Sequence, residues 1–287
     1  MSADKPGDRD GSAPAGAGDE LPAHLTPPPL PPEAFELQHE PKWSVGAPRD
    51  PWAHRRGEPR VFAFFWTLYV LLAIGGSVLW VARFASVSAG SYGPAARIML
   101  VVIAVGATVL WPMVRLSQSA PRGSIAAHVL TDVFVVLLPV QFVLWPLVIL
   151  AGWPLAVVAG VAAQLVVWVL LSGAVLAIGL CGTRTQTLGD PRLLARSGWM
   201  AAVMLAVGAG PLLALMFGLG HRSAPSWLVM MSPLTGISAI TGHGISGPEA
   251  PISAMQWRCV IVLAAAAAGV WVLAGVREWV GVRRRRA

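Results

Sequence analysis

One stretch of the sequence, from Val133 to Leu180, contains no aspartate, glutamate, lysine, arginine or histidine. A run of this kind is stable in lipid, where apolar side chains need no water and the helical backbone satisfies its own hydrogen bonds. The run is too long for one membrane-crossing helix and about right for two. Ala151-Gly152-Trp153-Pro154 supplies turn residues that divide it. The sequence therefore predicts two consecutive spans joined by a tight turn.

Other apolar runs occur between residues 59 and 280. Apolar side chains make up 55% of the residues and charged ones only 12%, a balance typical of a membrane protein and not of a soluble domain. We expect an all-α fold, a polytopic membrane helix bundle with about six transmembrane helices within residues 59–280. The expected spans cover residues 61–80, 98–114, 129–150, 153–180, 199–219 and 260–276.

A further apolar segment, Trp227 to Ile240, precedes the last span. At 1.5 Å per residue it is too short to cross a hydrocarbon core of about 30 Å. The sequence therefore predicts a segment that enters the bilayer and returns, or lies at its surface, before the last span. Ser232, Pro233 and Leu234 form the candidate re-entrant loop.

The two ends of the chain differ from the apolar middle. Residues 1–58 are rich in proline, glycine, alanine and charge, which predicts a disordered tail with polyproline II character. That tail is either a plain linker or a segment that docks a partner. Residues 281–287 form a short basic terminus.

The distribution of basic residues predicts the orientation. With both termini in the cytoplasm, the opposite side of the membrane keeps only four of the 21 lysines and arginines: Arg83, Arg97, Arg222 and Arg258. We therefore expect a multi-pass protein of the cell membrane. The formal net charge of +7 follows from this arrangement and from attraction to anionic lipids, so nucleic acid is not an expected partner.

One carboxylate stands out because it falls at the start of an expected span. Asp132 follows His128 by four residues, which places the two on one helical face. We predict a polar cluster of Arg115, His128 and Asp132 at the cytoplasmic side. The alternative is that Thr131 or Asp132 only caps the helix at the level of the cytoplasmic headgroups.

The remaining polar residues give no pattern for catalysis or for a cofactor. Six histidines all fall in tails, loops or span edges, which argues against haem ligation, and the two cysteines form no C-x-x-C pair. Gly244-Ile245-Ser246-Gly247 resembles the serine motif of rhomboid proteases, but the later span has no histidine to act as base. We expect no enzymatic activity, no catalytic residue, and neither cofactor nor metal. Gln141 and Gln164 lie deep in spans and could bond to each other or across subunits.

A family resemblance covers about residues 165–280. Gly179 to Gln186, Gly210-Pro211 and Met231 to Thr235 resemble segments of the membrane subunit of type-2 ABC exporters: a small-residue exit from span four, a break in span five, and a Ser-Pro-Leu segment before the last span. The resemblance implies a homodimer that pairs with a separate ATP-hydrolysing subunit and moves its substrate by alternating access. The chain itself has no G-x-x-x-x-G-K-[ST] loop for binding ATP.

These observations lead to two alternative functions. The leading expectation is a permease-like subunit of an ABC-type exporter. The alternative is a non-transporting membrane scaffold or assembly protein whose proline-rich tail recruits cytoplasmic partners.

Overall fold

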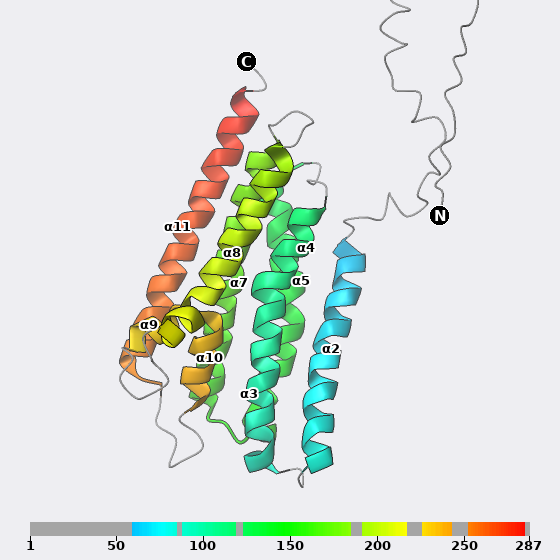
Figure 1. The fold of residues 1–287 in the computed structure, drawn as a ribbon, viewed down its shortest axis with the longest axis vertical. Helices are drawn as coiled ribbons and strands as arrows, with labels where there is room; N and C mark the ends of the chain where they lie inside the picture. Colours follow the sequence, from blue (N-terminus) through cyan, green and yellow to red (C-terminus); the bar gives the residue numbers. More distant parts are fainter. Residues whose placement is uncertain are drawn as a thin grey trace, which may run out of the picture. The chain divides into compact units, whose positions relative to one another are not determined.

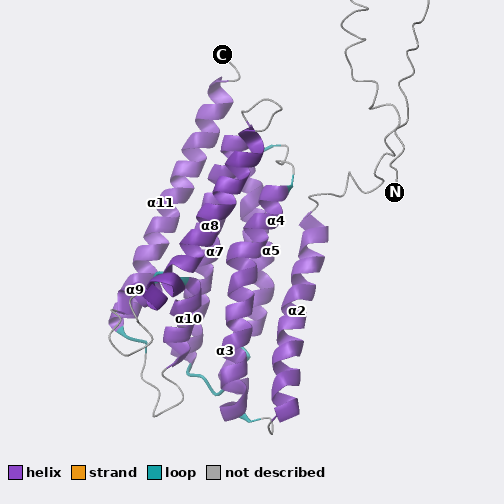
Figure 2. Ribbon diagram, in the orientation of Figure 1, coloured by secondary structure: helices purple, strands orange, loops and turns teal. Residues whose placement is uncertain are grey.

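The computed structural model describes residues 59–84, 88–118, 123–184, 191–216, 226–242 and 252–284. Every regular element in these ranges is helical, and no strand occurs among them (Figure 2). The chain is therefore an all-α helix bundle, as the apolar runs predicted. The proline-rich tail at 1–58 and the Gly244 to Gly247 motif lie outside the described residues.

Five helical stretches are long and apolar enough to cross a membrane: Val61–Arg83, Gly90–Ser117, Ile125–Leu150, Leu155–Cys181 and Ala254–Gly281. The expected span at 199–219 overlaps α8 (Pro191–Met216), which runs alongside the others (Figure 1), and its last three residues lie outside the described residues. Its apolar part, Ser197–Leu213, is shorter than the five. A count of six crossings thus remains a prediction.

Helix α2 (Pro59–Phe84) lies at one side of the bundle, next to α3 (Figure 1). α3 (Ala89–Val105), the π-helical turn η4 (Gly106–Leu110) and α4 (Trp111–Ser117) form one continuous rod. The expected span at 98–114 therefore begins nine residues too late, because the Ser88 side chain accepts a hydrogen bond from the Ser91 N–H and starts the helix before the apolar run.

The next part of the chain forms α5, α6 and the buried helix α7. α5 (Ile125–Leu144) contains Pro139 and is followed by the short α6 (Leu147–Leu150), so the helix is interrupted at Pro146. The predicted turn lies between α6 and α7 (Leu155–Arg184), where Gly152 adopts a φ of 63° that suits glycine. α7 contacts α5, α8, α10 and α11 and is the most buried of the five long apolar helices.

The last three helices have other bounds than the sequence predicted. The apolar segment near 227–240 is two short helices, α9 (Ser226–Met230) and α10 (Pro233–Thr241). α11 (Ala254–Arg284) extends well beyond the expected span at 260–276 and includes residues 281–284 of the basic terminus. It extends because Ser253 and Gln256 exchange hydrogen bonds at its start, and because arginines suit the last turn of a helix.

Large apolar side chains cover the outer faces of the peripheral helices, as a lipid-embedded bundle requires. On α2, Phe64, Phe65, Leu72 and Leu79 are exposed, and on α5, Phe134 and Phe142. The starts of α2, α5 and α8 and the ends of α4, α7 and α11 all lie at one end of the bundle (Figure 1). For brevity we call this the α11-terminal end. α9 and α10 lie toward the opposite end.

Candidate functional site

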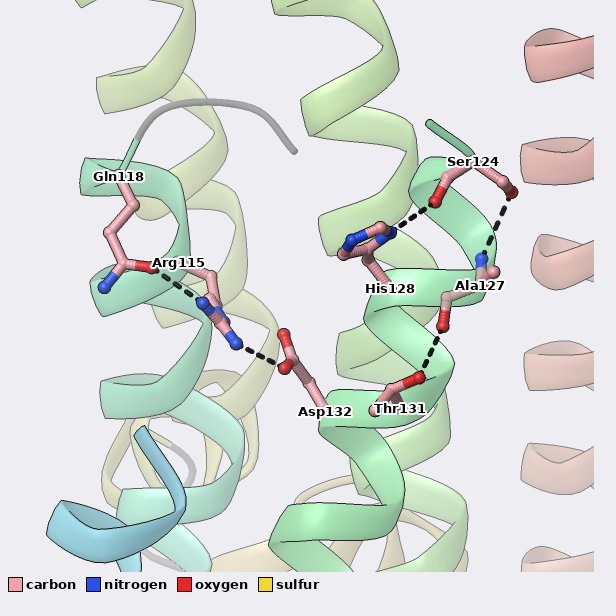
Figure 3. A network of polar contacts seen from close by, with 7 residues as sticks. All are labelled: Arg115, Gln118, Ser124, Ala127, His128, Thr131 and Asp132. Carbon is pink, nitrogen blue, oxygen red and sulfur yellow. Dashed lines mark hydrogen bonds and ion pairs between the residues drawn. The ribbon is translucent and has the colours of Figure 1, made fainter. Parts of the chain in front are cut away.

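Arg115 and Asp132 form an ion pair inside the bundle. Arg115 lies on the last turn of α4 and Asp132 lies two turns into α5, and their side chains are only 10% and 6% exposed. The guanidinium group also donates a 2.8 Å hydrogen bond to the Gln118 Oε1 (Figure 3). It lies 5.0 Å from the centre of the Phe62 ring. A buried carboxylate in lipid needs such a partner, because desolvation of an unpaired charge is costly.

His128 is not part of this contact. Its Nδ1 lies 2.9 Å from the Ser124 carbonyl oxygen on its own helix, and the residue is exposed (Figure 3). The predicted cluster is therefore a pair plus Gln118 and Phe62, with His128 to one side. The four-residue spacing placed His128 and Asp132 on one face of the helix. Arg115 of α4 pairs with Asp132 and not with His128.

The alternative interpretation, in which Thr131 or Asp132 caps the helix, is wrong. α5 begins at Ile125, and its capping residue is Ser124, whose side chain accepts a hydrogen bond from the Ala127 N–H. Asp132 is thus well inside the helix, where the backbone N–H groups are already bonded to preceding carbonyls.

A second carboxylate, Glu278 of α11, reaches this start of α5. It accepts hydrogen bonds from the Ile125 N–H at 2.8 Å, the Ala126 N–H at 3.2 Å and the Ser124 hydroxyl at 3.2 Å. A negative charge at a helix N-terminus is stabilising, so Glu278 joins α11 to α5. Sequence reasoning missed it, and the only available signal was an acidic residue near the end of an expected span.

The Ser232, Pro233 and Leu234 segment lies at the break between α9 and α10. Ser232 is fully buried, donates a hydrogen bond of 2.7 Å to the Val207 carbonyl of α8, and caps α10 by accepting from the Leu234 N–H. Pro233 follows as the first residue of α10, where its missing N–H costs nothing. This loop is therefore seated in the bundle interior.

Two further polar contacts hold this segment. Gln164 of α7 donates its Nε2 to the Met230 carbonyl at 3.0 Å, so it does not bond to Gln141. Arg97 of α3 donates its Nε to the Thr241 Oγ1 at 2.9 Å and its Nη2 to the Thr241 carbonyl at the end of α10. A cation at a helix C-terminus is favourable. The α9–α10 segment is thus bonded to α3, α7 and α8.

Glycines allow this close seating. A Cβ at Gly210 of α8 would lie 2.3 Å from the Ser232 Cβ, and one at Gly236 of α10 would lie 2.7 Å from the Gln164 Nε2. Both distances are too short for a real contact, so each glycine is needed for the fit. In the described residues, no group of three or more metal-ligating side chains of the His, Cys, Asp or Glu types occurs.

No protein-family model, curated protein or solved structure matches this chain. The residues themselves are therefore the basis for any statement about function.

Proposed function

We propose that this chain is the permease-like membrane subunit of an ABC-type exporter and works with a separate ATP-hydrolysing subunit. The observation that carries the proposal is the broken α9–α10 segment, which lies between α8 and α11 and is bonded to α3, α7 and α8. Non-helical backbone at membrane depth is tolerated where protein buries it or where it lines a substrate cavity.

Two other features support the proposal. Hydrogen bonds hold the segment through single side chains, so breaking a few of them releases it, as alternating access requires. The start of α2 and the end of α11 lie at one end of the bundle, which fits two cytoplasmic termini and a cytoplasmic ATPase (Figure 1). A homodimer in the cell membrane belongs to the same proposal.

The first test is affinity purification of the full chain from its own membranes in mild detergent, followed by identification of the proteins that accompany it. We expect a nucleotide-binding subunit whose ATPase activity depends on this chain. A chain that purifies alone, or with soluble proteins that bind only residues 1–58, contradicts the proposal and favours the membrane scaffold.

The second test examines the α9–α10 segment. Gly210→Val should abolish the coupled ATPase activity, because the added side chain displaces Ser232. Gly208→Val is the matched control on the same helix, since the nearest atom to a Cβ there is 4.0 Å away in Leu212. Equal activity of the two variants would contradict a role for this segment in transport.

A further inference from the structure

The break between α9 and α10 gathers oxygen atoms inside the bundle. The last two residues of α9 present carbonyls that accept from side chains: Val229 from the Thr235 hydroxyl at 2.6 Å and Met230 from the Gln164 Nε2 at 3.0 Å. The Ser232 hydroxyl, fully buried, lies between the two helices and bonds to the Val207 carbonyl of α8.

The donors at this break are engaged, so the capacity that remains is mostly that of acceptors. Ser232 and Thr235 each use their one hydroxyl hydrogen on a carbonyl. The Ser232 oxygen also accepts from the Leu234 N–H, so one of its lone pairs remains, whereas the Thr235 oxygen keeps both of its lone pairs. The carbonyls of Val229 and Met230 each keep a second lone pair. Pro233 contributes no N–H.

Gln164 adds an acceptor that has no partner. The residue is 0% exposed, and within the described residues its Oε1 has no hydrogen-bond partner. Its carboxamide lies against Gly236 and Met230, so the Oε1, bonded to the same carbon as Nε2, also lies at the break. A buried acceptor left unpaired costs about 1–3 kcal/mol, and native proteins place a ligand, ion or water at such an atom.

We infer that this break binds a sodium ion. The Val229 and Met230 carbonyls and the Gln164 Oε1 each carry a partial negative charge, which attracts a cation. The oxygens are neutral amide, hydroxyl and carbonyl groups, whereas Mg²⁺ and Ca²⁺ sites rely on carboxylates, so the ligand set suits a monovalent ion. Broken helices of transporters coordinate Na⁺ through unwound carbonyls in the same manner.

The site also explains why α10 requires Gly236. An alanine there would push the Gln164 amide away from the break and remove the Oε1 from the set. The ion would join α7 to the α9–α10 segment and stabilise its seated position.

Thermal unfolding of the full chain in detergent tests the inference, with NaCl exchanged for choline chloride at constant ionic strength. We expect the midpoint to rise with Na⁺, by about 5 °C when Na⁺ exceeds its dissociation constant about 100-fold. Gln164→Leu should remove this rise, and Gln141→Leu, at the half-buried glutamine of α5, should keep it. Thr235→Val, which deletes only the hydroxyl oxygen, replaces Gln164→Leu if that variant does not fold.

An equal midpoint in NaCl and choline chloride overturns the sodium site. A rise that persists in both Gln164→Leu and Thr235→Val overturns it as well. The measurement uses the isolated chain without an ATPase, so its outcome is independent of the exporter proposal.

Discussion

At the scale of single residues, Asp132 is the group whose burial needs the most explanation. Its side chain is 6% exposed in a helix that can cross the bilayer, and the ion pair with Arg115 is what makes this burial tolerable. Removal of one partner leaves the other charge buried and uncompensated, whereas removal of both leaves an apolar contact. The double variant should therefore lose less unfolding free energy than the sum of the losses of the two single variants.

Asp132→Ala should lower the free energy of unfolding by about 3 kcal/mol, because Arg115 loses its counter-charge. Arg115→Met combined with Asp132→Leu should be more stable than Asp132→Ala. Unfolding in detergent, followed by circular dichroism, measures both. His128→Ala is the control, and we expect little change from it because His128 contacts its own helix. The single variants Arg115→Met and Asp132→Leu complete the comparison, and losses that simply add to the loss of the double variant would contradict a direct ion pair.

At the scale of elements, the contacts between helices depend on features at their ends and on one irregular turn. α5 is capped by its own Ser124 and by Glu278 of α11. The η4 turn lies beside the stacked Trp66 and Tyr69 rings of α2, which occupy the space next to Gly106. A π-helical turn holds one residue more than an α-helical turn, so it sets the rotation of α4 and with it the direction of Arg115.

Glu278→Ala should cost about 1 kcal/mol of stability, the usual effect of a lost helix cap. The loss should be local, since the first N–H groups of α5 lose their acceptor. Hydrogen exchange at Ile125 and Ala126, measured by mass spectrometry, should become faster. Arg277→Ala, at the neighbouring exposed residue, is the control. Unchanged exchange at the start of α5 would mean that Glu278 is not the cap.

Gly106→Ala should destabilise the chain by about 1–3 kcal/mol, because the new Cβ would lie 2.4 Å from the Tyr69 Cε1 and the ring cannot move without leaving its stack. Gly76→Ala on α2 is the matched control. A Cβ at that position meets nothing within 4 Å, so the change should be neutral or slightly stabilising. Thermal midpoints of the two variants in the same detergent provide the comparison, and equal midpoints would contradict the packing at η4.

At the scale of the whole molecule, the bundle places the starts of α2, α5 and α8 together with the ends of α4, α7 and α11 at its α11-terminal end (Figure 1). The positive-inside rule predicts that this end faces the cytoplasm, because most lysines and arginines lie in the tail, the connections and the terminus expected on that side. The polar pair of Arg115 and Asp132 also belongs to this end, whereas the α9–α10 segment belongs to the opposite end. The two candidate sites are thus separated along the bundle.

Labelling of single cysteines from each side of the membrane tests this orientation. In a chain with Cys181 and Cys259 replaced, Ser197→Cys and Arg283→Cys should react from the cytoplasmic side, and Ser88→Cys from the other. Reagents that do not cross the membrane, applied to intact cells and to inverted vesicles, make the distinction. Reaction of Ser197→Cys and Arg283→Cys from opposite sides would mean that α8 does not cross the bilayer with the rest.

Much of the architecture could be predicted because span length and hydrophobicity are local properties of the sequence. Each apolar run of the right length must form a helix in lipid, whichever neighbours it finds. Helix boundaries were less predictable, since caps such as Ser88 and Ser124 extend a helix beyond its apolar part. The candidate pair was predicted in part, because Arg115 and Asp132 flank one short connection.

By itself, the sequence determined that the chain is a bundle of membrane helices with a short apolar segment before the last one. Only the tertiary structure decided which side chains meet: Glu278 with the start of α5, Gln164 with Met230, and Arg97 with Thr241. These partners are 66 to 153 residues apart. Their meeting depends on how each helix is rotated about its axis, and that rotation is set by packing at glycines and at η4, which no local pattern encodes.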